Sequence, residues 1–233
     1  MRIVTISGKK RSGKDTTADI ICEHRNAIKY ALAYPIKEAL DISYEKLALF
    51  EKSGVKLTFA DFNGETDFDR ESPLLLSNDD VHNLIIKSLE FLVKTYNLHI
   101  PTRETSRIDN EIATLIMGNR KSWSIRRLMQ TLGTDVVVSL IDREFWSRCM
   151  MQAYFDQLVK GKDVFIITDI RHPHEANLVR NLGAIILHIE RDTLNTDQDE
   201  HVSEAGINKL PHEPVIKNNG TIEDLTKAVL AHI

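Results

Sequence analysis

At 233 residues, the chain is long enough for one large α/β domain, or a core with an insertion, around a sizeable buried core. Lys and Arg number 30 against 34 Asp and Glu, and this net charge of −4 argues against sequence-independent binding to nucleic acid, which requires a basic face. The two cysteines, Cys22 and Cys149, have no metal-ligand neighbours at short spacing, and no apolar run approaches membrane length. We therefore expect a cytoplasmic protein without structural zinc and with neither a membrane nor a nucleic acid as partner.

The first stretch of the chain has the order of a phosphate-binding loop. Residues 2–7 (RIVTIS) are mostly apolar and β-branched, which predicts a short buried strand that begins directly after Met1 rather than a signal peptide. The loop 8–14 (GKKRSGK) follows, and a helix opens at Asp15. Its glycines let successive N–H groups point at one anion, while the helix N-terminus and Lys14 add positive charge. This order predicts a P-loop; the alternative is a glycine turn that binds nothing.

The end of this loop departs from the usual pattern at one position. Gly-Lys is commonly followed by Ser or Thr, but here Asp15 takes the hydroxyl position and Thr16 comes one residue later. We therefore predict that Thr16 supplies the hydroxyl on the magnesium side. The carboxylate of Asp15 suits the positive end of the helix dipole, because it lies in the first turn.

A second strand and a helix are predicted next. Residues 27–32 read as a strand, and Pro35 opens a helix whose apolar face extends to Leu49. Lys37 lies in the first turn of this helix, where a lysine opposes the dipole unless an anion lies nearby. It is either an anion-binding group or an ordinary solvated lysine.

The segment 51–77 is polar and punctuated by glycines, which predicts a long irregular connection of the kind that is usually functional. Within it, Arg70 is flanked by Asp69 and Glu71, so the guanidinium is either held by carboxylates and aimed at a ligand or part of an ordinary charged surface.

Two further helical regions follow. Ser77 or Asn78 caps a helix that extends through Val93, and the pattern breaks over 97–110. Residues 122–133 form a capped helix with a terminal glycine, and its paired arginines, Arg126 and Arg127, offer fork geometry for a phosphate. A second helix after it carries Asp142, Arg143, Trp146 and Arg148. For any single arginine here, the alternative to phosphate binding is a place on an exposed charged face of the helix.

The strand predicted over 163–169 ends in a carboxylate, Asp169, with Arg171 two residues later. In open parallel sheets, ligands lie beyond the carboxyl ends of the strands, so both residues are expected to face the same crevice as the P-loop. Asp169 is predicted to hold magnesium through water or to orient the acceptor, and Arg171 to neutralise charge on the transferred phosphoryl group. The next helix, 173–182, carries His174 and Glu175 in its first turn, where Glu175 either pairs with an arginine or caps the helix.

The C-terminal part contains two more predicted strands, 184–190 and 215–216, separated by a polar, acidic flap over 192–213. His188 in the first of them is predicted to be a satisfied core residue. No Lys or Arg occurs between Arg191 and Lys209, so the flap cannot supply catalytic cations, which must come from elsewhere. The last helix is predicted to begin with a capping box formed by the pair Thr221 and Asp224.

Together, these motifs resemble the deoxynucleoside monophosphate kinases of T4-like phages. The similarity covers most of the chain and is carried by the segments 8–19, 32–37, 67–71 and 123–135, by Asp142-Arg143, Trp146, Asp169-Ile-Arg171, His174-Glu175, His201 and Ser203-Glu204, and by 218–221. It is thinnest at 45–62 and 94–120. The resemblance implies a P-loop kinase fold with a parallel central sheet flanked by helices, and a homodimer that supplies DNA precursors in the infected bacterial host. It also implies ATP with Mg²⁺ and transfer of the γ-phosphoryl group to a 2′-deoxynucleoside 5′-monophosphate (dNMP).

On this basis we expect a single P-loop kinase domain. Its core is formed by 1–35 and 160–233, its mostly helical monophosphate-binding region by about 36–159, and its short lid by about 192–213. Another small-molecule P-loop kinase, of the dephospho-coenzyme A or phosphomevalonate type, is the nearest alternative. An ATP-switched binding protein is the alternative from another class.

The predicted site residues fall into four groups. The catalytic group is Lys14, Arg11, Arg171 and Asp169. The ATP-binding group is Lys10, Arg11, Ser12, Gly13, Lys14, Asp15, Thr16, Thr17 and Asn219. The dNMP-binding group is Ile36, Lys37, Arg70, Arg126, Arg127, Gly133, Thr134, Trp146, Asp169, Arg171, His174 and Glu175. The magnesium ligands are Thr16 and Asp169.

Overall fold

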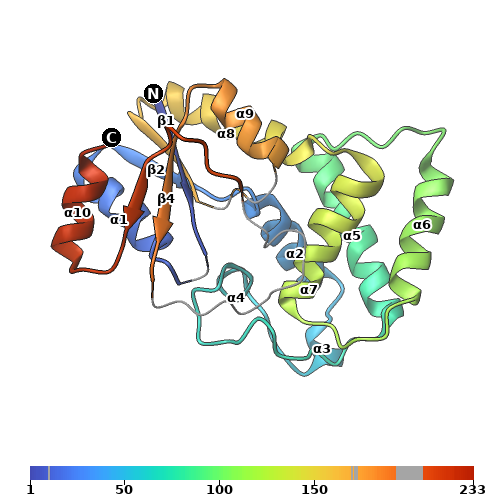
Figure 1. Cartoon of the computed structure of the whole chain (residues 1–233). Coiled ribbons are helices and arrows are strands. Elements are labelled where there is room, and N and C mark those ends of the chain that lie inside the picture. The colour runs from blue at the N-terminus through green and yellow to red at the C-terminus, as the bar shows by residue number, and fades with distance from the viewer. Residues whose placement is uncertain (10, 169, 171–172, 193–206) are drawn as a thin grey trace. The chain divides into compact units, whose positions relative to one another are not determined.

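A computed structural model describes residues 1–9, 11–168, 170, 173–192 and 207–233 (Figure 1). The chain divides into two compact units. The core unit consists of Met1–Leu32 and Ser147–Ile233, and the helical unit is Ala33–Trp146.

The core unit is built on a sheet of five described strands that all pair in parallel, in the order β2-β3-β1-β4-β5. This confirms the parallel central sheet that the sequence predicts. The strands are β1 (Arg2–Ser7), β2 (Ala27–Tyr30), β3 (Val164–Ile167), β4 (Ile185–Glu190) and β5 (Val215–Lys217). Because the strands are parallel, the loops after β1, β3, β4 and β5 leave from the same edge of the sheet.

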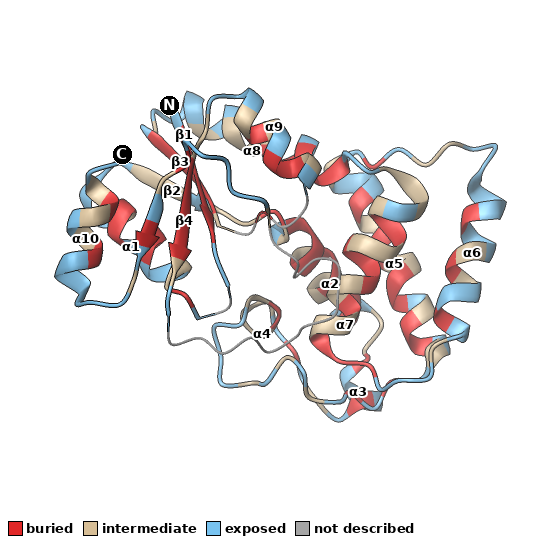
Figure 2. Ribbon diagram, in the orientation of Figure 1, coloured by how far each residue is buried: buried red, intermediate tan, exposed pale blue. Residues whose placement is uncertain are grey.

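Alternate side chains of the strands point to opposite faces of the sheet, and both faces are covered by helices. On one face, Val4 and Ile6 of β1 pack in a cluster with residues of α1 (Lys14–His24) and α10 (Ile222–Leu230). On the other, Ile3 packs with residues of α8 (Phe145–Val159) and α9 (Pro173–Asn181). Figure 2 shows the sheet as the buried centre of this unit. The sheet therefore holds the P-loop at the end of a fully packed strand.

The helical unit consists of helices joined by irregular segments. These are α2 (Tyr34–Lys46), α3 (Phe50–Ser53), α4 (Phe59–Asn63), α5 (Asn78–Tyr96), α6 (Thr105–Met117), α7 (Ile125–Gln130) and the π-helix η1 (Thr131–Ile141). α2 packs against α4, α5 and α7, and α6 packs against α5 and η1. As predicted, α5 is capped by Ser77, whose side chain accepts a hydrogen bond from the Asp80 N–H.

Three details of this unit differ from the prediction. The connection over 51–77 contains the short helices α3 and α4. The region 97–110, where the helical pattern of the sequence is interrupted, contains the start of α6. In α6, the buried residues Ile108, Ile112 and Ile116 recur every four positions, a helical stripe set among polar residues. The helix predicted to end at Gly133 instead continues from α7 into η1.

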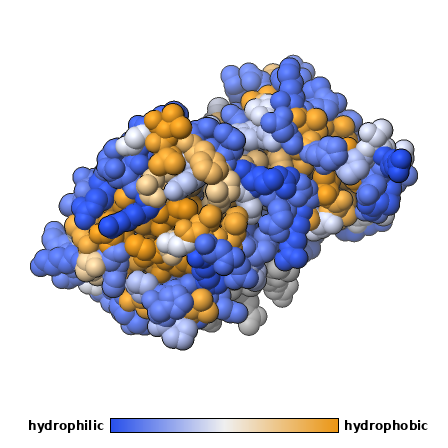
Figure 3. Space-filling view, turned by 90° about the horizontal axis from the view of Figure 1, so that it is seen from above, coloured by the Kyte–Doolittle hydropathy of each residue, from blue (hydrophilic) through white to orange (hydrophobic). Residues whose placement is uncertain are grey.

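The outer face of α8 carries exposed apolar side chains at helical spacing. Phe155, Leu158 and Val159 are 52%, 42% and 87% exposed. Figure 3, seen from above α8 and α9 in the view of Figure 1, shows hydrophobic residues gathered on this face. Among the described residues, no helix is both long and apolar enough to cross a membrane.

Candidate active site

The loop between β1 and α1 lies so close to other segments of the core unit that neither Gly8 nor Gly13 has room for a side chain. A Cβ atom at Gly8 would clash with the backbone oxygen of Ile189, and one at Gly13 would clash with the Asn218 side chain. Gly13 also has φ of 103°, a left-handed conformation that glycine adopts at little cost. The loop is thus held in a tight turn directly at the N-terminus of α1, as the P-loop prediction requires.

Side chains of this loop leave a polar interior suited to an anion. The Oγ of Ser12 is buried and has no hydrogen-bond partner among the described residues. Nζ of Lys14 donates to the backbone oxygens of Gly8 and Lys9 at 2.7 and 2.8 Å, which folds the ammonium back over the loop. An unpaired buried hydroxyl and a folded-back lysine beside a helix N-terminus fit a bound phosphate.

The two threonines after Lys14 differ in their surroundings. Thr17 is fully buried and its Oγ1 donates to the Gly13 oxygen at 2.9 Å, whereas Thr16 is exposed. The exposed hydroxyl at the start of α1 suits a cation bound to the phosphates of a ligand in the loop, and Asp15 also lies exposed in this first turn.

Charged side chains at and beyond the ends of β4 and β5 pair with one another beside the P-loop. Lys217 pairs with Glu190 at 2.9 Å and Asp192 at 3.2 Å, and Lys209 also pairs with Glu190. Hydrogen bonds from Lys209 and then Lys217 lower the pKa of Glu190 to about 2. Asn219 belongs to the same group of residues, because both polar atoms of its carboxamide form hydrogen bonds with Asp192.

In the helical unit, several predicted acceptor residues lie in one hydrogen-bonded series. Lys37 is buried at the start of α2, and its Nζ donates to Oδ1 of Asn63 in α4 at 2.7 Å. Arg70 donates to the backbone oxygen of Phe62, the residue before Asn63, at 3.4 Å. The backbone oxygen of Arg70 accepts from the N–H of Arg126 at 3.0 Å. Lys37 and Arg70 are thereby bonded to adjacent residues of α4, and Arg126 is linked to Arg70 through the backbone.

A second group of predicted acceptor residues surrounds Gly133. A Cβ atom at Gly133 would lie 2.6 Å from Cδ1 of Ile36, so this glycine allows η1 to pack closely on α2. Nε1 of the buried Trp146 donates to the Gly133 oxygen at 3.0 Å, and Thr134 follows on η1 with partial exposure. The predicted helix end at Gly133 is therefore wrong for a physical reason, because the missing side chain serves close packing rather than a left-handed cap.

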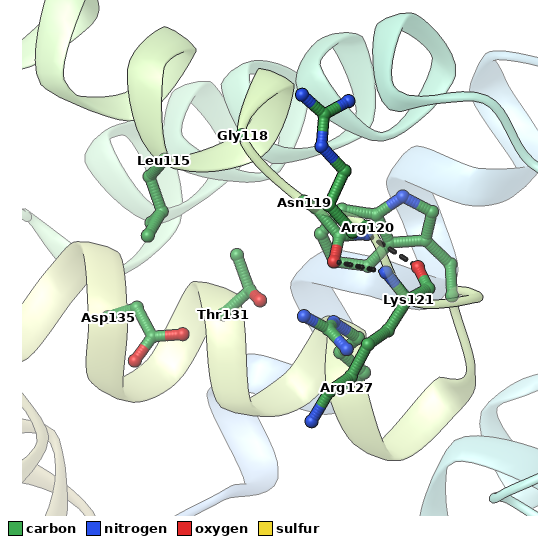
Figure 4. A pocket seen from close by; sticks show the side chains of 9 residues that line it. Leu115, Gly118, Asn119, Arg120, Lys121, Arg127, Thr131 and Asp135 are labelled. Atoms are coloured by element: carbon green, nitrogen blue, oxygen red, sulfur yellow. Dashed lines mark hydrogen bonds between the residues drawn. The ribbon is translucent and has the colours of Figure 1, made fainter.

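Adjacent positions on α7 place Arg126 and Arg127 in different surroundings. Nε of Arg126 lies 3.2 Å from Oε1 of Glu71. The guanidinium of Arg127 lies 5.2 Å from the ring centroid of Trp123 and lines a cavity of about 320 Å³. Figure 4 shows this cavity, where Leu115 projects from α6 toward η1, which carries Thr131 and Asp135. Of the two arginines, Arg126 is the one bonded to the segment that carries Arg70.

The remaining predicted residues belong to the core unit. His174 and Glu175 lie in the first turn of α9, and Glu175 is buried. Lys10, Asp169, Arg171 and the flap residues 193–206 lie outside the described residues. His188 is buried as predicted, and its Nε2 contacts Oε2 of Glu213 at 2.8 Å.

Three residues that contact the predicted site are not among the site residues predicted from the sequence. Asn63 binds Lys37, Glu71 pairs with Arg126, and Asn218 donates to the Ser12 oxygen at 2.8 Å. In the sequence, Asn63 is part of an Asn-Gly turn signal, and Asn218 directly precedes the predicted Asn219. Only their positions in the fold therefore identify these two asparagines as contacts of the site.

The parallel sheet and the glycine-bounded loop between its central strand and α1 define a P-loop kinase fold. A family model described as deoxynucleotide monophosphate kinase matches residues 2–229. The chain therefore belongs to the deoxynucleotide monophosphate kinase family. This is a family of phosphotransferases, so the protein is an enzyme that uses a nucleoside triphosphate and a small nucleotide as substrates.

Individual relatives agree with the family match. The chain is 38% identical, over 237 aligned residues, to the deoxynucleotide monophosphate kinase of Escherichia phage RB69, covering 97% of this chain and 96% of the relative. It is 35% identical to that of Enterobacteria phage T4, covering 97% and 95%. A shorter match, 29% identical over 109 residues, covers 42% of this chain and 41% of the deoxynucleoside-5′-monophosphate kinase of Escherichia phage T5.

Proposed function

We propose that this protein transfers the γ-phosphoryl group of ATP to a 2′-deoxynucleoside 5′-monophosphate, yielding ADP and the deoxynucleoside diphosphate. The observation that carries the proposal is a P-loop whose buried Ser12 hydroxyl has no hydrogen-bond partner among the described residues, in a chain that matches this kinase family over 2–229. The matched relatives from phages RB69 and T4 are named deoxynucleotide monophosphate kinases, which supports the proposed acceptor. The wider role proposed is the supply of DNA precursors in the cytoplasm of a phage-infected bacterium.

The donor site is proposed to lie on the P-loop. Its backbone N–H groups, with Ser12 and Lys14, would hold the β- and γ-phosphates, while Thr16 and Asp169 would hold Mg²⁺. When bound, Mg²⁺ neutralises negative charge on the phosphate oxygens and orients them. The further residues proposed to line the ATP site are Lys10, Arg11, Gly13, Asp15, Thr17 and Asn219. The folded-back Lys14 and the exposed Thr16 support these roles.

The acceptor is proposed to bind to residues of the helical unit. Lys37, Arg70 and Arg126 would hold its 5′-phosphate, since Lys37 and Arg70 bond to adjacent residues of α4 and Arg126 is linked to Arg70 through the backbone. The close packing of Gly133 on Ile36, with Trp146 bonded to Gly133, supports a defined wall for the nucleoside. The remaining proposed acceptor contacts are Arg127, Thr134, Asp169, Arg171, His174 and Glu175.

The transfer itself is proposed to be a direct in-line displacement without a covalent enzyme intermediate. Such a reaction depends on positioning and charge neutralisation more than on a nucleophilic side chain. Arg11 and Arg171 are proposed to stabilise the charge that develops on the transferred group, and Asp169 to orient the acceptor phosphate. Lys14 would follow the β- and γ-phosphates, since its flexible stem carries a point charge.

The protein is also proposed to be a homodimer. The exposed apolar stripe formed by Phe155, Leu158 and Val159 on α8 supports this, because an apolar helix face is self-complementary across a two-fold axis. Sedimentation of the purified protein, with Val159→Lys as the matched variant, tests it. A wild-type dimer that becomes monomeric in the variant is expected, and a monomeric wild type would contradict the proposal.

The competing functions gain no support from the family match. A kinase acting on dephospho-coenzyme A or phosphomevalonate would require a different acceptor, and an ATP-switched binding protein would hydrolyse ATP without an acceptor.

An acceptor panel tests the proposal directly. Purified protein with ATP and Mg²⁺ is offered each of the four dNMPs, their ribose counterparts, dephospho-coenzyme A and phosphomevalonate, and both products are quantified chromatographically. We expect ADP and a deoxynucleoside diphosphate in equal amounts with at least one dNMP. Lys14→Ala is the control, and its turnover should fall by about 10²-fold or more, since it removes a cation that stabilises the transferred phosphoryl group. ATP consumption that no dNMP accelerates would refute the proposed activity.

A further inference from the structure

Asn218 joins the loop after β5 to the P-loop. Its Nδ2 donates to the backbone oxygen of Ser12 at 2.8 Å, across 206 residues of sequence. The same nitrogen approaches Gly13 so closely that a Cβ atom there would clash with it. The half-buried carboxamide therefore lies directly against the peptide bond between Ser12 and Gly13.

The backbone around Asn218 is fixed from the β4 side. Its N–H donates to the Glu190 oxygen at 2.7 Å. The preceding residue, Lys217, pairs with Glu190 and Asp192, and the following residue, Asn219, bonds to Asp192 with both polar atoms of its side chain. Within the part of the P-loop that the structure describes, Asn218 is the one of these three consecutive residues whose side chain bonds to the loop.

We propose that Asn218 is a positioning residue for the donor nucleotide, acting through the P-loop rather than by direct contact. In a trans peptide, the carbonyl oxygen of Ser12 and the N–H of Gly13 lie in one plane and point in opposite directions. Holding the oxygen on Asn218 therefore keeps the carbonyl turned away from the triphosphate and the Gly13 N–H directed toward it. This role rests on the proposed function, because it presupposes that ATP binds in the P-loop.

A series at this position separates the hydrogen bond from bulk and charge. Asn218→Ala removes the donor, Asn218→Asp replaces it with a carboxylate of the same shape, and Asn218→Gln keeps a donor on a longer stem. We expect the dissociation constant for ATP, measured by calorimetry without acceptor, to rise about 3- to 10-fold in the alanine variant, as for the loss of one hydrogen bond. The aspartate variant should be weakened at least as much, because its charge repels the triphosphate, and the glutamine variant less.

Steady-state kinetics provide the second readout. The KM for ATP should rise in Asn218→Ala while the KM for the dNMP changes less than twofold. Asn26→Ala is the matched control, since the Asn26 carboxamide also donates to a backbone oxygen, that of Gly161 at 2.9 Å, but lies just before β2 at the opposite edge of the sheet. Asn26→Ala should lower the melting temperature about as much as Asn218→Ala does, without changing the affinity for ATP.

Two results would overturn the role of Asn218. One is an ATP dissociation constant for Asn218→Ala within twofold of wild type, and the other is an equal rise in both KM values. The wild-type titration keeps this failure distinct from that of the proposed function. If wild type binds no ATP, the proposed function fails; if it binds ATP and the alanine variant binds equally well, only the positioning role fails.

Discussion

The carboxylate of Glu71 lies 3.2 Å from Nε of Arg126, and the two side chains differ in exposure, at 56% for Glu71 and 18% for Arg126. The backbone N–H of Arg126 donates a hydrogen bond to the backbone oxygen of Arg70. An exposed carboxylate contributes little to such a pair, because water screens it. Glu71 thus orients the Arg126 guanidinium while its own carboxylate stays in contact with water.

Replacement of Arg126 should therefore affect the acceptor specifically. We expect Arg126→Ala to raise the KM for the dNMP about 10- to 100-fold, the effect of losing a charge-assisted hydrogen bond, with the KM for ATP within about threefold of wild type. Glu71→Gln is the companion variant and should change the acceptor KM by less than about fivefold, as for an exposed ion pair. An unchanged acceptor KM in Arg126→Ala would remove this arginine from the acceptor site.

The neighbouring Arg127 should behave differently because it stacks on Trp123. Arg127→Met keeps the length and apolar stem of the side chain and loses the cation. We expect the free energy of unfolding, measured by urea denaturation, to fall by about 1 kcal/mol, the scale of a partly exposed cation–π contact. The acceptor KM should change less than in Arg126→Ala. Equal increases in the two variants would instead show that the two arginines contribute equally to acceptor binding.

The close approach of Gly133 to Ile36 can be tested by a double-mutant cycle. In the wild-type background, we expect Gly133→Ala to lower the free energy of unfolding by about 1 kcal/mol or more, since the new methyl group meets Cδ1 of Ile36. Ile36→Val deletes that carbon. In this background, Gly133→Ala should be neutral or stabilising by up to about 1 kcal/mol, the helical preference of alanine over glycine. Additive effects within about 0.5 kcal/mol would contradict the contact.

The parallel sheet was predictable because its strands carry strong local signals. Residues of β1 and β3 are apolar on both faces, and the loop after β1 has the glycine and lysine spacing of a phosphate site. α6 was missed because its isoleucine stripe is narrow and lies among polar residues. The role of Gly133 was not predictable, because a glycine near a helix end can serve either as a left-handed cap or for close packing, and the sequence does not distinguish the two.

For the candidate site, residue types were predictable but their partners were not. Lys37 and Arg70 were identified by charge in unusual positions, yet their connection through α4 depends on a helix that the sequence did not predict. The separation of Arg126 from Arg127 follows from the phase of α7, and the different contacts of Asn218 and Asn219 follow from hydrogen bonds to residues 190–192. Such long-range contacts are set by tertiary packing rather than by local pattern.

A buried charged cluster ties the described end of the predicted flap to the sheet. Glu213 accepts from Arg180 Nε at 2.7 Å and from the Leu210 N–H at 2.9 Å, and it contacts His188. Arg180 also donates to the Asn208 oxygen at 2.7 Å. Burial alone would raise the pKa of Glu213, but the hydrogen bonds from Arg180, Leu210 and His188 outweigh it and lower the pKa to about 2.

This lowered pKa gives stability a defined pH dependence. The ordinary pKa of the carboxyl group is 4.5, so its contacts stabilise the folded state fully above that pH, and the contribution is lost as pH falls toward 2. We expect Glu213→Gln to reduce the free energy of unfolding by about 3 kcal/mol at pH 7, because it leaves Arg180 with an uncharged partner. The difference from wild type should shrink steadily below pH 4.5. Glu223→Gln, at an exposed position of α10, is the control and should change stability by less than about 0.5 kcal/mol. Urea denaturation at several pH values measures both, and a difference between wild type and Glu213→Gln that stays constant from pH 7 to pH 3 would show that the Glu213 carboxylate does not stabilise the fold.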